Sequence, residues 1–192
     1  KMKVFKFGGA SVKDADAIRN VVNILSSYKE EKLMIVSSAM GKTTNALEAV
    51  VEAYVNKKGD AVEALKQVKD THYQAMSLLF DKGDPVFDAV NDTFVEIEWV
   101  IEDEADESYD YIYDQIVSVG EMLSTKILAA YLNKINLPTN WLDARDVIAT
   151  DNTYREAQIQ WKETVVRMNE TVPLMLEKGF VITQGFIGGT SE

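Results

Sequence analysis

Short apolar runs and helically spaced apolar positions alternate along the first 40 residues of the chain. Val4–Phe7 is apolar apart from one lysine, which is typical of a short strand, and Gly8 and Gly9 end it. From about Asp14 to Tyr28, apolar side chains recur at the three- and four-residue spacing of one helix face. Leu33–Val36 is uniformly apolar, as in a strand buried on both faces. The pattern predicts a strand–helix–strand unit with parallel strands and a right-handed crossover.

The middle of the chain, from about Asn45 to Leu132, has helical spacing in most of its segments. We expect helices that begin near Asn45, Ala61, Pro85 and Gly120. Beyond them, the pattern predicts strands at 138–142 and 180–183, a helix near 162–177 and a second glycine-rich turn at 185–189. Alternating strands and helices predict an α/β class, a layered fold with a mostly parallel sheet and a long helical section.

Composition and charge exclude several kinds of protein. The 192 residues fit one domain, and 20 basic against 31 acidic side chains give a net charge of −11. Such a charge opposes a nucleic-acid binder and a protein held on anionic lipid, so we expect neither partner. There is no cysteine, which excludes disulfides and thiolate chemistry. No apolar run is long enough to span a bilayer, and the N-terminus lacks a signal-peptide pattern, so we expect a cytoplasmic protein.

The segment around the first glycine pair is a candidate anion site. Lys6 ends an apolar strand, Gly8 and Gly9 allow backbone N–H groups to approach phosphate oxygens, and Ser11 adds a hydroxyl before the helix. The start of that helix is expected to add a favourable dipole. Lys6 would place a compact positive charge near a transferred phosphoryl group. The alternative is a simple strand–turn–helix corner with an exposed lysine.

A second candidate is the loop of small hydroxyl residues that follows the second strand. Gly41-Lys42-Thr43 resembles the end of a P-loop, but the required earlier glycine is replaced by Val36. The loop lies where open α/β sheets bind ligands, so Ser38 and Thr44 are candidates for binding a small polar substrate. Alternatively, Thr44 or Asn45 caps the next helix.

Other polar and aromatic residues have less specific interpretations. Glu121 lies at a helix start, where it either complements the dipole or receives an ammonium group. His72 is interpreted as structural, and the acidic run from Glu96 to Asp114 as a solvated face without calcium-loop spacing. The three tryptophans are expected in the core or at an interface: Trp99, Trp141 and Trp161. We assign no metal ligand.

Five segments, in this order along the chain, resemble the N-terminal part of aspartate kinases, which are members of the amino acid kinase family. Lys6–Val12 resembles the Lys-Phe-Gly-Gly-Thr-Ser-Val motif of that family, and Val36–Asn45 its second loop. Gly120–Thr125 resembles its Gly-Glu-x-x-Ser motif. Trp141–Arg145 and Thr183–Gly188 resemble two further strand and loop segments. The likeness extends over essentially the whole chain.

The resemblance implies phosphoryl transfer from MgATP to the β-carboxylate of L-aspartate, which gives 4-phospho-L-aspartate in the first step of lysine, threonine and methionine biosynthesis. By this likeness Lys6 is catalytic and, with Gly8, Gly9 and Ser11, binds the ATP phosphates. Ser38, Thr44 and Glu121 would bind aspartate, with Glu121 receiving the α-ammonium group. The implied cofactors are ATP and Mg²⁺, and the complete enzyme is expected to be a homo-oligomer.

Two departures from the family pattern affect this interpretation. Ala10 stands where the family usually has threonine. The resemblance also implies that residues 1–192 are the N-terminal, aspartate-binding part of an amino acid kinase domain, without the nucleotide-binding half and the regulatory domains. We therefore expect this portion alone to be inactive. The alternatives are another carboxylate or carbamate kinase of the same family, or a non-catalytic interaction module with exposed Trp and Tyr side chains.

Overall fold

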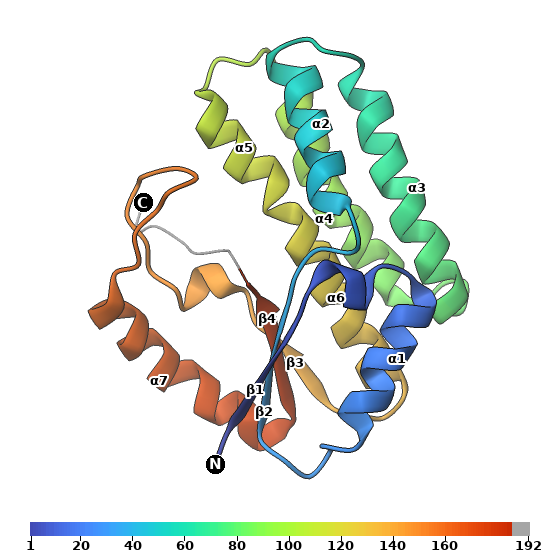
Figure 1. Cartoon of the computed structure of the whole chain (residues 1–192), viewed down its shortest axis with the longest axis vertical. Helices are drawn as coiled ribbons and strands as arrows, with labels where there is room; N and C mark the ends of the chain where they lie inside the picture. The colour runs from blue at the N-terminus through green and yellow to red at the C-terminus, as the bar shows by residue number, and fades with distance from the viewer. Residues whose placement is uncertain (186–192) are drawn as a thin grey trace.

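The computed structural model describes residues 1–185 as four strands, seven α-helices and two short 3₁₀ helices (Figure 1). The strands are β1 Lys3–Phe7, β2 Leu33–Ser37, β3 Thr139–Trp141 and β4 Phe180–Gln184. The helices are α1 Ala15–Ser26, α2 Thr43–Val55, α3 Ala61–Leu79, α4 Pro85–Glu102, α5 Tyr109–Val117, α6 Val119–Lys134 and α7 Trp161–Lys178, with 3₁₀ helices η1 Gly9–Val12 and η2 Ala144–Asp146. The second glycine-rich turn expected at 185–189 lies outside the described residues after Gly185.

The four strands form one parallel sheet in the order β1-β2-β4-β3. The predicted strand–helix–strand unit is therefore confirmed as β1–α1–β2, with Lys3 opposite Leu33 and Phe7 opposite Ser37. β4, the last of these strands along the chain, lies between β2 and β3. The predicted α/β class with a parallel sheet is confirmed.

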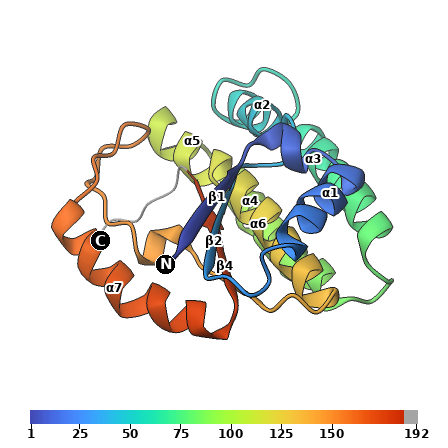
Figure 2. The same ribbon diagram turned by 60° about the horizontal axis from the view of Figure 1, so that its bottom comes forward.

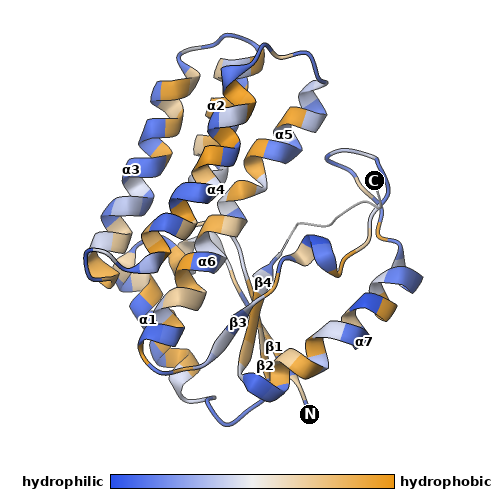
Figure 3. Ribbon diagram, turned by 180° about the vertical axis from the view of Figure 1, so that it is seen from behind, coloured by the Kyte–Doolittle hydropathy of each residue, from blue (hydrophilic) through white to orange (hydrophobic). Residues whose placement is uncertain are grey.

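Alternate side chains of the central strands enter two different cores. Ile35 and Ile182 pack in the larger core with α1 and α6, whereas Met34 and Val181 pack with Leu176 of α7 in a smaller one. Figure 2 shows α7 on one side of the sheet, and α1 and α6 on the other. β2 is almost wholly apolar, as a strand covered on both faces requires, and Figure 3 shows the hydrophobic colouring of the central strands.

The long helical section gathers beyond the end of the strands at which the chain leaves β1 and β2 (Figure 1). Its expected helices are confirmed as α2, α3, α4 and α6, and Pro85 occupies the first turn of α4. Helix α5 is an addition that the apolar pattern did not predict. Its Tyr109 donates a hydrogen bond of 2.7 Å to Glu52, and Tyr113 donates one of 2.6 Å to Glu48, so α5 is tied to α2.

The polar stretch between η2 and α7 folds back on itself through an antiparallel bridge between Thr150 and Ile159. Near its tip, Arg155 has a left-handed φ of 66°. Its guanidinium carbon lies 3.9 Å from the centre of the Tyr113 ring, and its backbone N–H donates to Asp114 at 2.7 Å. The segment between η2 and α7 is thereby held against α5.

The core interpretation of the tryptophans holds for one of the three. Trp141 is half-buried against the larger core and against Met122 and Ala144, whereas Trp99 is 66% exposed and Trp161 is 68% exposed. Trp99 and Trp161 are therefore not in the core, and the interface alternative for these two residues stays a prediction. Within residues 1–185, no helix combines the length and hydrophobicity needed to cross a membrane.

Candidate functional site

Two loops lie side by side where the chain leaves β1 and β2. The N–H of Ser38 donates to the carbonyl of Phe7 at 3.0 Å, and the N–H of Gly41 donates to the carbonyl of Gly9 at 2.9 Å. These bonds extend the strand pairing beyond the sheet. The glycine loop and the hydroxyl loop, predicted as two candidate sites, therefore form one continuous surface.

Gly9 is required by the close approach of these loops. A Cβ at this position would lie 2.7 Å from the carbonyl oxygen of Gly41 and 3.0 Å from that of Ala39, distances that backbone atoms do not tolerate. Gly41 has a φ of 51°, in the left-handed region that favours glycine. Gly8 is exposed, and a Cβ added to it would have no atom within 4 Å. Of the two adjacent glycines, the second is therefore the one that the packing of the loops demands.

The first turn of α6 is packed against the second loop. A Cβ on Gly120 would meet Ala39 at 3.0 Å and Leu47 at 3.2 Å, so only a residue without a side chain fits easily there. One turn later, the Ser124 hydroxyl donates to the carbonyl of Ser38 at 2.6 Å. Together these contacts hold the first turn of α6, which contains Glu121, against the loop after β2.

Glu121 is a buried carboxylate rather than a solvent-facing helix-start residue. The residue is 9% exposed, and its Oε2 accepts a hydrogen bond of 3.0 Å from the N–H of Gly185, which follows β4. A carboxylate so removed from water needs hydrogen bonds or a cation as partners. The geometry suits a group that binds a cationic part of a substrate.

The side chains of Lys6 and Val36 project from the same face of the sheet. Lys6 pairs with Val36 in the β1–β2 register, and Val36 pairs with Thr183 in β4, so the three side chains project to the same side. A Cβ position at Gly185 lies 3.6 Å from Val36 and 3.9 Å from Oε1 of Glu121. Gly185 thus lies next to both Val36 and Glu121, and Lys6 projects from the same sheet face as Val36.

Two further lysines, to which the sequence interpretation assigned no role, border the joined loops. Lys42 directly follows Gly41, and the Cβ of Lys13 is 3.4 Å from the Cβ position of Gly41. Both residues are exposed. Lys6 is therefore not the only lysine near the loops, because the turn at Gly41 brings Lys13 alongside. The site has local positive charge in a chain whose net charge is −11.

The structure corrects two expectations about helix starts. Helix α1 begins at Ala15, where the Asp14 side chain accepts from the N–H of Ala17, so its N-terminus is not at the glycine pair. Ser11 instead lies in η1, the short 3₁₀ turn between them. Thr44 does not cap α2, because that helix begins at Thr43 without a side-chain cap bond. Thr44 lies in the first turn and is exposed, as substrate contact requires.

The other features interpreted as structural have no ligand-like geometry. His72 is fully buried, its Nδ1 lies 2.8 Å from the carbonyl of Val68, and burial lowers the pKa of its imidazole. In the part of the chain that the structure describes, no cluster of three or more His, Asp or Glu residues could hold a metal ion.

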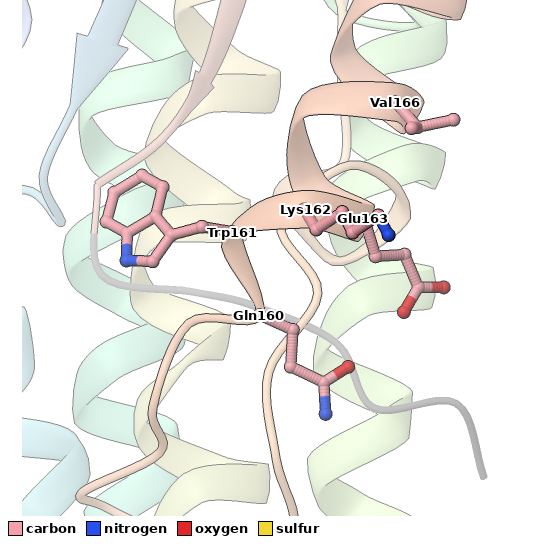
Figure 4. Close-up of a pocket in the computed structure, with 5 residues that line it drawn as sticks. All are labelled: Gln160, Trp161, Lys162, Glu163 and Val166. Carbon is pink, nitrogen blue, oxygen red and sulfur yellow. The ribbon is translucent and has the colours of Figure 1, made fainter.

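A hollow of about 500 Å³ at the start of α7 contains none of the candidate residues. It is lined by Gln160, Trp161, Lys162, Glu163 and Val166. Figure 4 shows these side chains spreading outward from the first turns of the helix instead of converging on one point. Ligand sites have polar groups that converge, so we assign no site here.

Sequence reasoning assigned no separate role to Ser124 or Gln184, which both support the site. Ser124 fixes the carbonyl of Ser38, and Gln184 is a buried polar side chain at the end of an apolar strand. A polar residue that ends an otherwise apolar buried strand was the available signal for Gln184, since such a group must find hydrogen-bond partners.

A family model described as "Amino acid kinase family" matches residues 1–192. Among curated relatives, chloroplastic aspartokinase 1 of Arabidopsis thaliana is 36% identical over 157 residues, which cover 78% of this chain and 27% of the relative. Lysine-sensitive aspartokinase 3 of Escherichia coli (strain K12) is 28% identical over 98% of this chain and 41% of the relative. The chain thus spans well under half the length of these relatives.

Solved structures give the same family likeness. The crystal structure of E. coli aspartokinase III in complex with aspartate and ADP has a TM-score of 0.89 at 27% identity, and covers 100% of this chain and 42% of that one. The aspartate kinase of Clostridium acetobutylicum has a TM-score of 0.76 at 25% identity, over 100% of this chain and 40% of that one.

Proposed function

Since the chain belongs to the amino acid kinase family, we propose that the protein of which it forms part transfers the γ-phosphoryl group of ATP to the β-carboxylate of L-aspartate. The products are 4-phospho-L-aspartate and ADP, in the first step towards lysine, threonine and methionine. The observation that carries this proposal is the packing of α6 against the joined loops after β1 and β2, with the buried Glu121 carboxylate bound to the N–H of Gly185. The relative bound to both aspartate and ADP supports the choice of substrates.

Each candidate residue has a role that its position supports. We assign the ATP phosphates to Lys6, Gly8, Gly9 and Ser11, because the glycine loop is exposed next to local lysines. We assign aspartate to the hydroxyls of Ser38 and Thr44 and to the carboxylate of Glu121, which would receive the α-ammonium group.

Phosphoryl transfer requires mainly that the protein positions the two substrates and stabilises the charge of the transition state. A β-carboxylate oxygen attacks the γ-phosphorus while the bond to the β–γ bridging oxygen breaks, and that oxygen leaves on ADP. Negative charge spreads over the transferred group, so a compact lysine charge at Lys6 lowers the barrier. Because both substrates are anions and the chain is acidic, the lysines around the loops also offset repulsion during binding.

Mg²⁺ is usually held by phosphate oxygens with one or two carboxylates, so we assign it to ATP and to no residue of 1–185. The homo-oligomer and the cytoplasmic location stay predictions. The 192-residue chain spans 41% of its E. coli relative, so we expect the chain alone to be inactive.

The test is steady-state kinetics of the full-length protein with a coupled ADP assay. Lys6→Ala should lower kcat by roughly 10²-fold or more, the scale for losing one transition-state stabiliser. Lys58→Ala is the matched control, because Lys58 is exposed in the turn after α2 and pairs with Glu52. A kcat of Lys6→Ala equal to that of the control would contradict the assigned role. Aspartate must also outperform glutamate, carbamate and N-acetylglutamate as acceptor, or another member of the family is indicated.

A further inference from the structure

Gln184, the last residue of β4, is a buried side-chain amide with three protein elements around it. The residue is 1% exposed. Its Oε1 accepts from the backbone N–H of Ala144 at 2.8 Å, and its Nε2 donates to the hydroxyl of Thr125 at 2.9 Å. The amide therefore joins the end of β4 to the first residue of η2 and to α6.

The direction of these hydrogen bonds is fixed by the donors involved. A backbone N–H can only donate, so the Ala144 N–H requires the amide oxygen of Gln184 on its side and leaves the NH₂ group for Thr125. The indole N–H of Trp141 also donates to the Thr125 hydroxyl, at 2.9 Å. With both acceptor positions of the hydroxyl filled, its proton is directed to the carbonyl of Glu121 at 2.7 Å.

Glu121 is consequently held at two points by consecutive residues of one strand end. Gln184 acts on its backbone through Thr125, and Gly185 acts on its carboxylate through a direct N–H bond of 3.0 Å. Each donor in such a chain polarises the next, and a complete buried network is rigid. We propose that Gln184 is a positioning residue that sets the carboxylate of Glu121 for the substrate ammonium group. This inference rests on the proposed function.

The test uses Gln184→Met in the full-length protein, since methionine is close in size but cannot accept from Ala144 or donate to Thr125. We expect the KM for aspartate to rise about tenfold or more, because small misplacements of a positioning group are costly, while the KM for ATP stays at the wild-type value.

The matched control is Asn140→Leu. Asn140 is another side-chain amide in the sheet, half-buried, which donates to the carbonyl of Met175 at 3.0 Å. It is paired with Val181, about 10 Å along β4 from the site at the strand rise per residue. We expect this control to lower the melting temperature while leaving both KM values unchanged. An aspartate KM for Gln184→Met no higher than that of Asn140→Leu would overturn the inference.

A ligand-free measurement separates the positioning role from the proposed reaction. Amide hydrogen exchange at Gly185 should be faster in Gln184→Met than in wild type and unchanged in Asn140→Leu, because the Glu121 carboxylate that holds the Gly185 N–H is released. Exchange at the wild-type rate would refute the positioning role whatever the protein phosphorylates. If wild type does not act on aspartate but the exchange result holds, the proposed function fails and the structural part of the inference stands.

A second pair of variants keeps the inference testable if Gln184→Met does not fold. Thr125→Ser keeps the hydroxyl that relays Gln184 to Glu121, and Thr125→Val removes it. We expect Thr125→Ser to retain the wild-type KM for aspartate and Thr125→Val to raise it. Equal values for the two variants would overturn the relay.

Discussion

The two adjacent glycines after β1 should respond in opposite ways to the same substitution. At Gly9, an alanine Cβ would lie 2.7 Å from the Gly41 carbonyl oxygen, so the loops would have to separate by roughly 0.7 Å to reach ordinary van der Waals distance. That movement lengthens the hydrogen bond between the Gly41 N–H and the Gly9 carbonyl, now 2.9 Å. Forced overpacking of this kind costs about 1–3 kcal/mol.

Gly8→Ala is the matched control. Its φ of −80° and ψ of 172° suit alanine, and nothing lies within 4 Å of the new Cβ. Alanine also restricts the unfolded chain, which stabilises a protein by about 0.4–1 kcal/mol where the native backbone fits. Gly8→Ala should therefore keep or raise the free energy of unfolding, although it would hinder phosphate approach to the loop.

Thermal unfolding of the full-length protein measures the difference. For 150–250 residues each kcal/mol moves the Tm by about 2–4 °C, and by less in a longer protein, so Gly9→Ala should unfold at a lower temperature than Gly8→Ala. We expect the KM for ATP to rise in both variants, since both change the phosphate loop. Equal Tm values for the two variants would refute the argument that the close approach of the loops requires Gly9.

Two further predictions concern pH. Burial lowers the pKa of His72 in the folded state, so the unfolded state binds the proton more readily and the free energy of unfolding should fall as pH drops below about 6.5. Urea unfolding at pH 7.5 and 5.5 should show a smaller difference in this free energy for His72→Leu than for wild type. An equal difference in the two proteins would contradict the buried-imidazole explanation. The hydrogen bond to Glu52 raises the pKa of Tyr109 to about 12, so its contribution to stability should persist below pH 10 and be lost as pH rises through 12. Ultraviolet titration of Tyr109→Phe should lack one high-pH tyrosine transition, whereas loss of an ordinary transition near pH 10 would show that the hydrogen bond is not maintained.

Local patterns were sufficient to predict the elements that carry the first half of the site. The apolar run 33–36, the spacing within 14–28 and the two glycines predicted β1, α1, β2 and the loop between them, because their chemistry is local. The likeness to aspartate kinases, carried by five ordered segments, is confirmed by the family match over residues 1–192. The roles assigned to single residues stay predictions.

What the sequence did not predict depends on contacts between distant residues. Helix α5 contains Tyr109-Asp110-Tyr111-Ile112-Tyr113, whose alternation has no clear helical period. It is held by Glu48, Glu52 and Arg155, which lie more than 40 residues away. The side-by-side loops likewise depend on backbone bonds that no side-chain pattern records.

The position of β4 has a consequence for how the protein is made. The strand that separates β2 from β3 is the last of the four to leave the ribosome, although its neighbour β2 already ends at Ser37. Until 180–185 emerge, no strand lies between β2 and β3, and the backbone amide that holds the Glu121 carboxylate does not yet exist. Such distant parallel pairing is slow and exposes apolar strands meanwhile. We therefore expect apolar surface of β2 to stay unpaired on its β4 side until residues 180–184 have been synthesised.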